Sequence, residues 1–98
     1  MRPAKLRTIV EELKFETEFD LLVRHKVPRV TEFVDGVIWL LARRPEEGKR
    51  IGSTDVWFVA NEFLRERKEL PLVIYYTFNE NIVYLLSITE SLYPPSNE

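Results

Sequence analysis

The sequence has 98 residues, enough for one small domain around one core. Apolar residues make up 45% and charged residues 31%, and 14 Lys and Arg stand against 16 Asp and Glu, for a net charge of −2. Overall attraction to nucleic acid or an anionic membrane is therefore excluded, and such binding would need a local patch. The chain has no cysteine, which excludes disulfides, thiolate metal sites and cysteine nucleophiles.

The sequence predicts a cytoplasmic protein that forms a single domain over residues 1–98, with flexible tails at 1–6 and 94–98. No run of about 18 apolar residues is present, so we expect no membrane segment. Acidic residues near the N-terminus argue against a signal peptide.

The first half of the chain predicts a helical hairpin. Residues 7–15, "RTIVEELKF", fit a strand or a helical turn, and we favour a strand. Residues 16–25 form a short amphipathic helix, which ends before Pro28. Residues 29–44 form a second helix with a sustained apolar stripe. The first stripe consists of Phe19, Leu22 and Val23, and the second of Val30, Phe33, Val34, Val37, Ile38 and Leu41.

The second half predicts strands. Residues 55–63, 71–78 and 82–89 are rich in β-branched and aromatic side chains. Only the short turn 79–81 separates the last two, so these should pair as an antiparallel hairpin. Their nearly continuous apolar content predicts that both sheet faces are largely covered, one of them by the helix pair.

Two basic clusters are candidates for a phosphate-binding site. The segment 43–50 contains four cations and two glutamates. A helix end with Pro45 and Gly48 as stop signals accounts for its composition, while Lys49 and Arg50 remain candidate phosphate contacts. The segment 64–70, "LRERKEL", alternates in charge like a solvated loop. No metal-binding or nucleotide-binding motif is present, and we expect no cofactor.

The element order, together with the segments "FETEFDLL", "RRPEEGKRI", "DVWFV", "LVIYYTF" and "IVYLLSI", resembles the RelE/ParE superfamily of type II toxin-antitoxin toxins over residues 7–93. The resemblance implies an α+β domain of order β-α-α-β-β-β, in which a four-stranded antiparallel sheet packs against an N-terminal helical hairpin. It also implies a cognate antitoxin protein as partner, and either ribosome-bound mRNA or DNA gyrase as target.

Members of that family that cleave mRNA use Arg, Lys and Tyr side chains. Fixed guanidinium groups stabilise charge on phosphate oxygens while an acid or base moves the proton. Tyr93 falls where the family has a terminal Tyr, and the loop cations Arg65 and Arg67 would substitute for the family's arginines, so these three are the candidate catalytic residues. The candidate nucleic-acid contacts, taken from the two basic clusters, are Lys49, Arg50 and Lys68.

The chain departs from the family where cations are usual: it has Asn61 near the end of the second predicted strand, Leu72 at the start of the third and Glu90 at the end of the fourth. An anion at Glu90 would repel phosphate. Three functions stay open: an mRNA endoribonuclease that uses the loop cations, a gyrase inhibitor, or a degenerate, non-catalytic protein-binding domain. A self-associating domain that buries Trp57 or Tyr84 in a homodimer is a further class.

Overall fold

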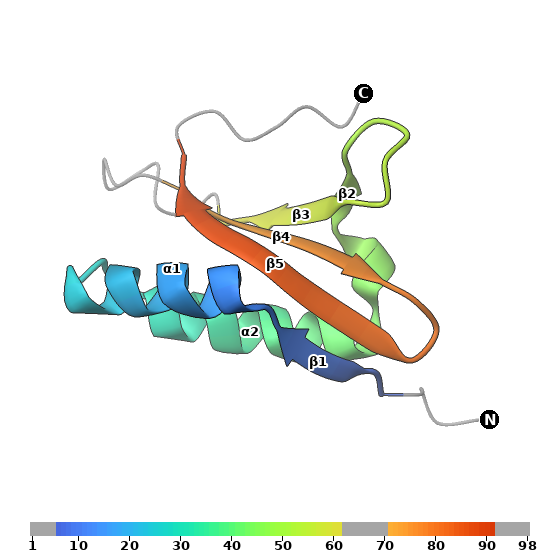
Figure 1. Ribbon diagram of the computed structural model, residues 1–98, viewed down its shortest axis with the longest axis horizontal. Coiled ribbons are helices and arrows are strands. Elements are labelled where there is room, and N and C mark those ends of the chain that lie inside the picture. The colour runs from blue at the N-terminus through green and yellow to red at the C-terminus, as the bar shows by residue number, and fades with distance from the viewer. Residues whose placement is uncertain (1–5, 62–70, 92–98) are drawn as a thin grey trace.

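The computed structural model describes residues 6–61 and 71–91. The elements in chain order are β1 (Thr8–Glu11), α1 (Leu13–Arg24), α2 (Val30–Arg43), the short 3-10 helix η1 (Pro45–Glu47), β2 (Lys49–Arg50), β3 (Trp57–Ala60), β4 (Leu72–Phe78) and β5 (Ile82–Glu90). Five strands form one sheet in the order β1-β5-β4-β3-β2, and both helices lie on the same face of it (Figure 1). The predicted α+β class is confirmed.

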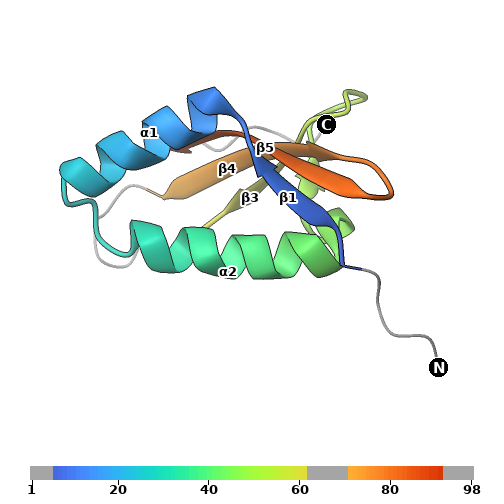
Figure 2. The ribbon, with the colours of Figure 1, turned by 60° about the horizontal axis from the view of Figure 1, so that its bottom comes forward.

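The sheet is mixed, so the expectation of a four-stranded antiparallel sheet is wrong. Strands β2 to β5 pair antiparallel, but β1 pairs parallel with β5, with Thr8 opposite Ile82 and Glu11 opposite Leu85. The two helices run in opposite directions (Figure 2), so α2 returns the chain to the end of the sheet where β1 began. Strand β2 runs opposite to β1, and each of β3, β4 and β5 reverses the strand before it, so that β3 and β5 both run in the direction of β1. Strand β2 has only two residues and was not predicted.

Strand β1 and helix α1 divide the segment 7–15 between them. The strand ends when the amide of Glu12 donates its last hydrogen bond to the Leu85 carbonyl, and the helix begins at the next residue. The predicted start of α1 at residue 16 is therefore too late. Phe15, which we predicted to lie in the strand, belongs to α1 and is its fully buried residue. Val23 leaves the predicted stripe, with 46% of its surface exposed.

Helix α1 ends in a Schellman motif that uses lysine where glycine is usual. The Lys26 amide donates to the Val23 carbonyl, and the Val27 amide donates to the Leu22 carbonyl. Lys26 therefore adopts a left-handed backbone with φ of 56°, and Arg29, before α2, has φ of 59°. A side chain in this region costs about 1 kcal/mol relative to glycine. The turn between the helices is consequently sharp, and the cations Lys26 and Arg29 occupy its two left-handed positions.

A β-bulge at Leu86 puts the correct side chains of β5 into the core. Tyr75 lies opposite Ser87, but Tyr76 lies opposite Leu85, so Leu86 is an additional residue in β5. The bulge allows side chains spaced by two and then by three residues to face the helices. These buried side chains are Val83, Leu85 and Ile88, and they pack with Leu72, Ile74 and Tyr76 of β4 and with Phe15, Val30, Val34, Val37 and Leu41 of the helices.

The phenol of Tyr76 joins the sheet to the turn after α2. Tyr76 is fully buried, and its hydroxyl donates a hydrogen bond to the Pro45 carbonyl. Gly48 lies directly against the phenol: a Cβ atom added there would overlap the Tyr76 hydroxyl and come within 2.8 Å of the Phe58 carbonyl oxygen. A glycine is therefore required at this close approach.

We expect Gly48→Ala to destabilise the protein by about 3 kcal/mol, because neither the buried ring nor the strand backbone can move away cheaply. Gly36 in α2 provides a matched control, since a Cβ atom there would meet nothing within 4 Å. Gly36→Ala should stabilise the protein by about 0.5–1 kcal/mol through helix propensity. Urea unfolding curves measure both changes. Equal effects of the two substitutions would contradict the close packing at Gly48.

Candidate functional site

Three positions where the family resemblance leads one to expect cations come together at one end of the sheet. The Asn61 amide donates to the Leu72 carbonyl at 2.9 Å, and Leu72 lies opposite Glu90 in the ladder. Leu72 is fully buried, so its side chain belongs to the core and is closed to a ligand, whereas Glu90 is exposed. The strand ends at this site therefore carry the side-chain amide of Asn61 and the carboxylate of Glu90, where the resemblance leads one to expect guanidinium groups.

The three predicted catalytic residues and one predicted nucleic-acid contact lie outside the described residues. They are Arg65, Arg67, Tyr93 and Lys68. The hydrogen bond between Asn61 and Leu72 holds the two described ends of the 62–70 connection side by side.

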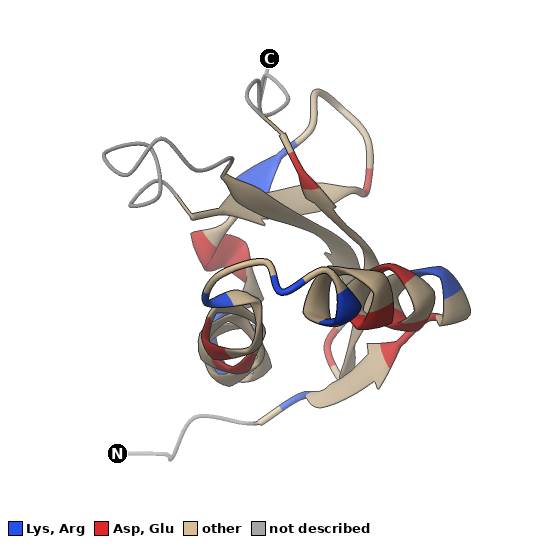
Figure 3. Ribbon diagram, turned by 90° about the vertical axis from the view of Figure 1, so that its left-hand side faces the viewer, with Lys and Arg blue, Asp and Glu red and all other residues tan. Residues whose placement is uncertain are grey.

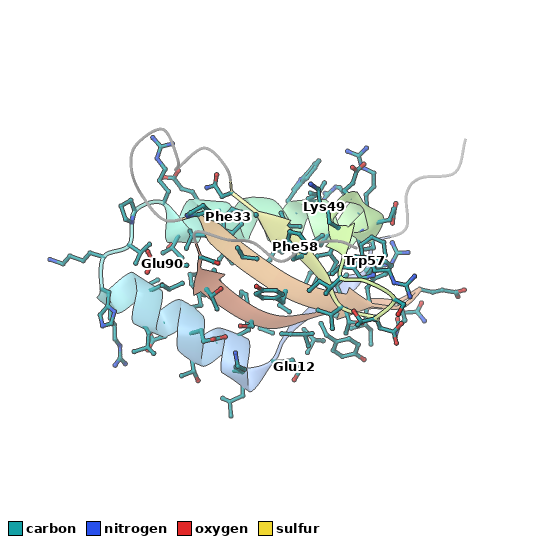
Figure 4. The ribbon with its side chains drawn as sticks, turned by 90° about the horizontal axis from the view of Figure 1, so that it is seen from above. Glu12, Phe33, Lys49, Trp57, Phe58 and Glu90 are labelled. Carbon is teal, nitrogen blue, oxygen red and sulfur yellow. The ribbon has the colours of Figure 1, made fainter. Side chains whose placement is uncertain are left out.

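Lys49 and Arg50 lie on β2, at the opposite end of β3 from Asn61. Lys49 pairs with Phe58, and Figure 4 shows it well separated from Glu90. The Arg50 guanidinium closes the turn that follows it, since it donates to the Thr54 carbonyl at 2.6 Å and to the Ser53 carbonyl at 3.2 Å. The two residues therefore do not join the strand-end positions in one site.

The other cations of the segment 43–50 also have intramolecular partners. The Arg43 guanidinium stacks over the Trp39 ring at 4.1 Å and donates to the Trp39 carbonyl at 3.0 Å. Arg44 pairs with Glu47 at 3.4 Å. Within the described part of the chain, Lys49 is the cation of this segment whose side chain has no ion pair, hydrogen bond or ring contact. The segment is thus a helix end and a turn held together by its own arginines.

Cations that the sequence analysis did not select lie in the turn between the helices. Lys26 and Arg29 are exposed there, and Figure 3 shows that this turn faces the same side of the molecule as the end of β5. Arg29 also lines a shallow pocket of about 210 Å³, together with Val23, Val27, Val30, Thr31 and Glu32. The sequence signal was the run "RHKVPR", whose cations the left-handed turn directs to one end of the fold.

A polar cluster fastens α1 to β5. Glu18 accepts hydrogen bonds from the Ser87 hydroxyl at 2.7 Å, from Lys14 at 2.9 Å and from the Ile88 amide at 3.3 Å. Lys14 also donates to the Ser87 hydroxyl at 3.0 Å. The carboxylate therefore takes the place of a neighbouring strand beyond the point where β1 ends. The (i, i+4) spacing of Lys14 and Glu18 was visible in the sequence, but their joint contact with β5 was not.

The electrostatics of Glu18 and Tyr76 suit structural roles. Partial burial opposes the charge on Glu18, but the bonds from Ser87 and Lys14, the charge of Lys14 and the Ile88 amide outweigh it and lower the pKa of Glu18 below 4.5. Burial raises the pKa of the Tyr76 phenol well above 10; the Gly48 backbone opposes this effect and the charge of Glu46 adds to it. Tyr76 thus remains a neutral hydrogen-bond donor at physiological pH.

Within residues 6–61 and 71–91, no group of three or more His, Asp or Glu side chains is placed to hold a metal ion. None of the helices in these residues is long and apolar enough to cross a membrane. Comparison of the chain with models of known protein families and with curated proteins finds no match.

We expect Arg50→Ala to lower the unfolding free energy by about 1 kcal/mol, because it removes the two hydrogen bonds that the guanidinium donates to the turn after β2. Lys49→Ala should change it by less than about 0.5 kcal/mol, since the Lys49 side chain is exposed. Chemical denaturation of both variants tests this difference. If Arg50→Ala proves neutral, the guanidinium does not support the turn.

The lowered pKa of Glu18 makes stability depend on acid pH. Its contribution is fully present above pH 4.5, the ordinary value, and is lost as the pH falls through the lower folded-state value. Between about pH 5 and about pH 2, the wild type should therefore lose more stability than Glu18→Gln, which cannot titrate. Glu16→Gln, an exposed change on the same helix, is the control and should follow the wild type. Parallel curves for the wild type and Glu18→Gln would contradict this role.

Proposed function

We propose that this chain is a toxin-like component of a type II toxin-antitoxin module with a RelE/ParE-like fold. The observation that carries the proposal is the arrangement of the elements. A helical hairpin covers one face of the sheet, and the three strands that follow it in the second half of the chain pair in succession, as the family resemblance implies. The partner is then a cognate antitoxin protein, and the target is ribosome-bound mRNA or DNA gyrase.

A second candidate function is that of a non-catalytic protein-binding domain of the same fold, and one observation favours it. The strand ends that meet at Asn61, Leu72 and Glu90 carry no cation, and Glu90 adds a negative charge where a phosphate would have to approach. Cleavage of mRNA would then depend on cations at other positions of the chain. Such cations are the predicted Arg65 and Arg67, or Lys26 and Arg29 in the helical turn.

The experiment is induced expression with and without the neighbouring reading frame. A toxin arrests growth, and coexpression of its antitoxin restores growth and yields a stable complex. Growth unaffected by induction, with a complex still formed, supports the protein-binding domain. Neither growth arrest nor a complex would contradict both functions.

The enzymatic version makes a sharper prediction. If the domain cleaves mRNA on the ribosome, Arg65→Ala combined with Arg67→Ala should lower the cleavage rate at least about 100-fold, because phosphate charge in the transition state loses its stabilising cations. Arg24→Ala, which removes an exposed cation paired with Asp20 on α1, is the matched control and should leave the rate unchanged. Primer extension on translated mRNA measures both rates, and a DNA supercoiling assay tests the gyrase alternative. Full activity of the double variant would show that these arginines do not catalyse.

A further inference from the structure

The outer edge of β1 has backbone groups that are free to bind another strand. The Thr8 amide donates to the Asn81 carbonyl and the Glu12 amide to the Leu85 carbonyl, so the even-numbered residues of β1 point toward β5. The amide and carbonyl groups of the odd-numbered residues consequently point outward. Within the described part of the chain, the amides of Ile9 and Glu11 have no acceptor. Figure 1 shows β1 at the margin of the sheet.

Helix α2 reaches this edge at one position. The Arg7 amide donates to the Ala42 carbonyl at the end of α2, at 2.8 Å. The free part of the edge therefore runs from Ile9 to Glu11. It is flanked by Leu6, which is 60% exposed, and by Leu13, which is 77% exposed, two of the most exposed large apolar side chains in the described residues. Neither a proline nor a bulge interrupts β1. Two of the usual devices that keep strand edges from pairing are thus missing here, while the strand is short, with four residues, and carries the charged Glu11.

We propose that the β1 edge binds a second copy of this chain, so that two β1 strands pair antiparallel about a two-fold axis at Val10. In this register Ile9 of each copy lies opposite Glu11 of the other, and their outward amides and carbonyls form four hydrogen bonds. The register leaves the bond between Arg7 and Ala42 intact. Two five-stranded sheets then join into one continuous sheet.

Side chains complement the backbone pairing. Arg7 of one copy lies diagonally across from Glu11 of the other on the same face of the sheet. Its guanidinium lies over the Phe78 ring of its own chain and donates from Nε to the Asn79 carbonyl at 2.9 Å, so the terminal guanidinium nitrogens are the donors that would meet Glu11 of the other copy. The two-fold axis repeats this pairing of opposite charges. It also brings Leu13 of one copy beside Leu6 of the other, which covers exposed apolar surface on both. Charge and apolar positions on a single strand thus match their own two-fold image, which favours a second copy over an unrelated peptide.

The proposal does not depend on the proposed function. The edge is short, so we expect a dissociation constant on the order of micromolar. Sedimentation of the full chain from about 5 to about 500 μM should show a monomer–dimer equilibrium. A monomer at every concentration would overturn the proposal.

Two pairs of variants test the edge and the register. Glu11→Pro removes an outward amide and no intramolecular hydrogen bond, so it should weaken dimerisation at least about tenfold while Glu11→Ala does so less. Circular dichroism checks that both variants remain folded. Because the chain has no cysteine, single cysteines report the register directly.

Val10→Cys should form a disulfide-linked dimer on mild oxidation, since its Cβ atoms face each other across the axis at about 5 Å. Thr8→Cys, on the same face of the same strand, should not, because its copies lie about 14 Å apart along the strands. Equal cross-linking of the two variants, or an undiminished dimer of folded Glu11→Pro, would overturn the proposal.

Discussion

The buried hydrogen bond from Tyr76 to the Pro45 carbonyl fixes how the sheet meets the helical layer. It joins the central strand β4 to the turn that leaves α2, and Gly48 permits the approach. From this turn the chain enters β2, which pairs with β3 and completes the sheet. The direction of every later strand follows, because each reverses the one before it. The Tyr76 phenol is neutral at physiological pH and can donate this bond, and burial raises its pKa further above the ordinary value.

Most cations of the segment 43–50 make contacts with the helix end and the turn in which they lie. Arg43 covers the exposed ring of Trp39, Arg44 pairs with Glu47, and Arg50 closes a turn. Each guanidinium satisfies carbonyl or carboxylate oxygens, or an aromatic face, that the helix end and the turn create. A cluster of cations in a sequence is therefore a weak indicator of a phosphate site where a helix ends.

Much of the fold could be predicted from the sequence. The apolar stripe from Val30 to Leu41 predicted α2 to within one residue at each end, and the short turn 79–81 predicted the β4–β5 hairpin. These patterns are local, since one helix face or one turn produces them. The parallel pairing of β1 could not be predicted, because it depends on where α2 returns the chain. The bulge at Leu86 could not be predicted either, since a continuous apolar run does not indicate which residue is unpaired.

The candidate site was harder to predict than the fold. The resemblance indicated that Asn61, Leu72 and Glu90 occupy equivalent places on three strands, and the ladder brings these positions together. It could not indicate that a hydrogen bond between Ser87 and Glu18, which are 69 residues apart in sequence, joins α1 to β5. Contacts of this kind arise only when two elements pack, and no spacing rule records them.

The hydrogen bond between the Asn61 amide and the Leu72 carbonyl closes the base of the 62–70 connection. Once a strand pair is closed at its base, doubling the length of the chain between the strands costs only about 0.6 kcal/mol in loop entropy. The register of β3 against β4 is therefore set by the described residues from Trp57 to Asn61 and their partners on β4.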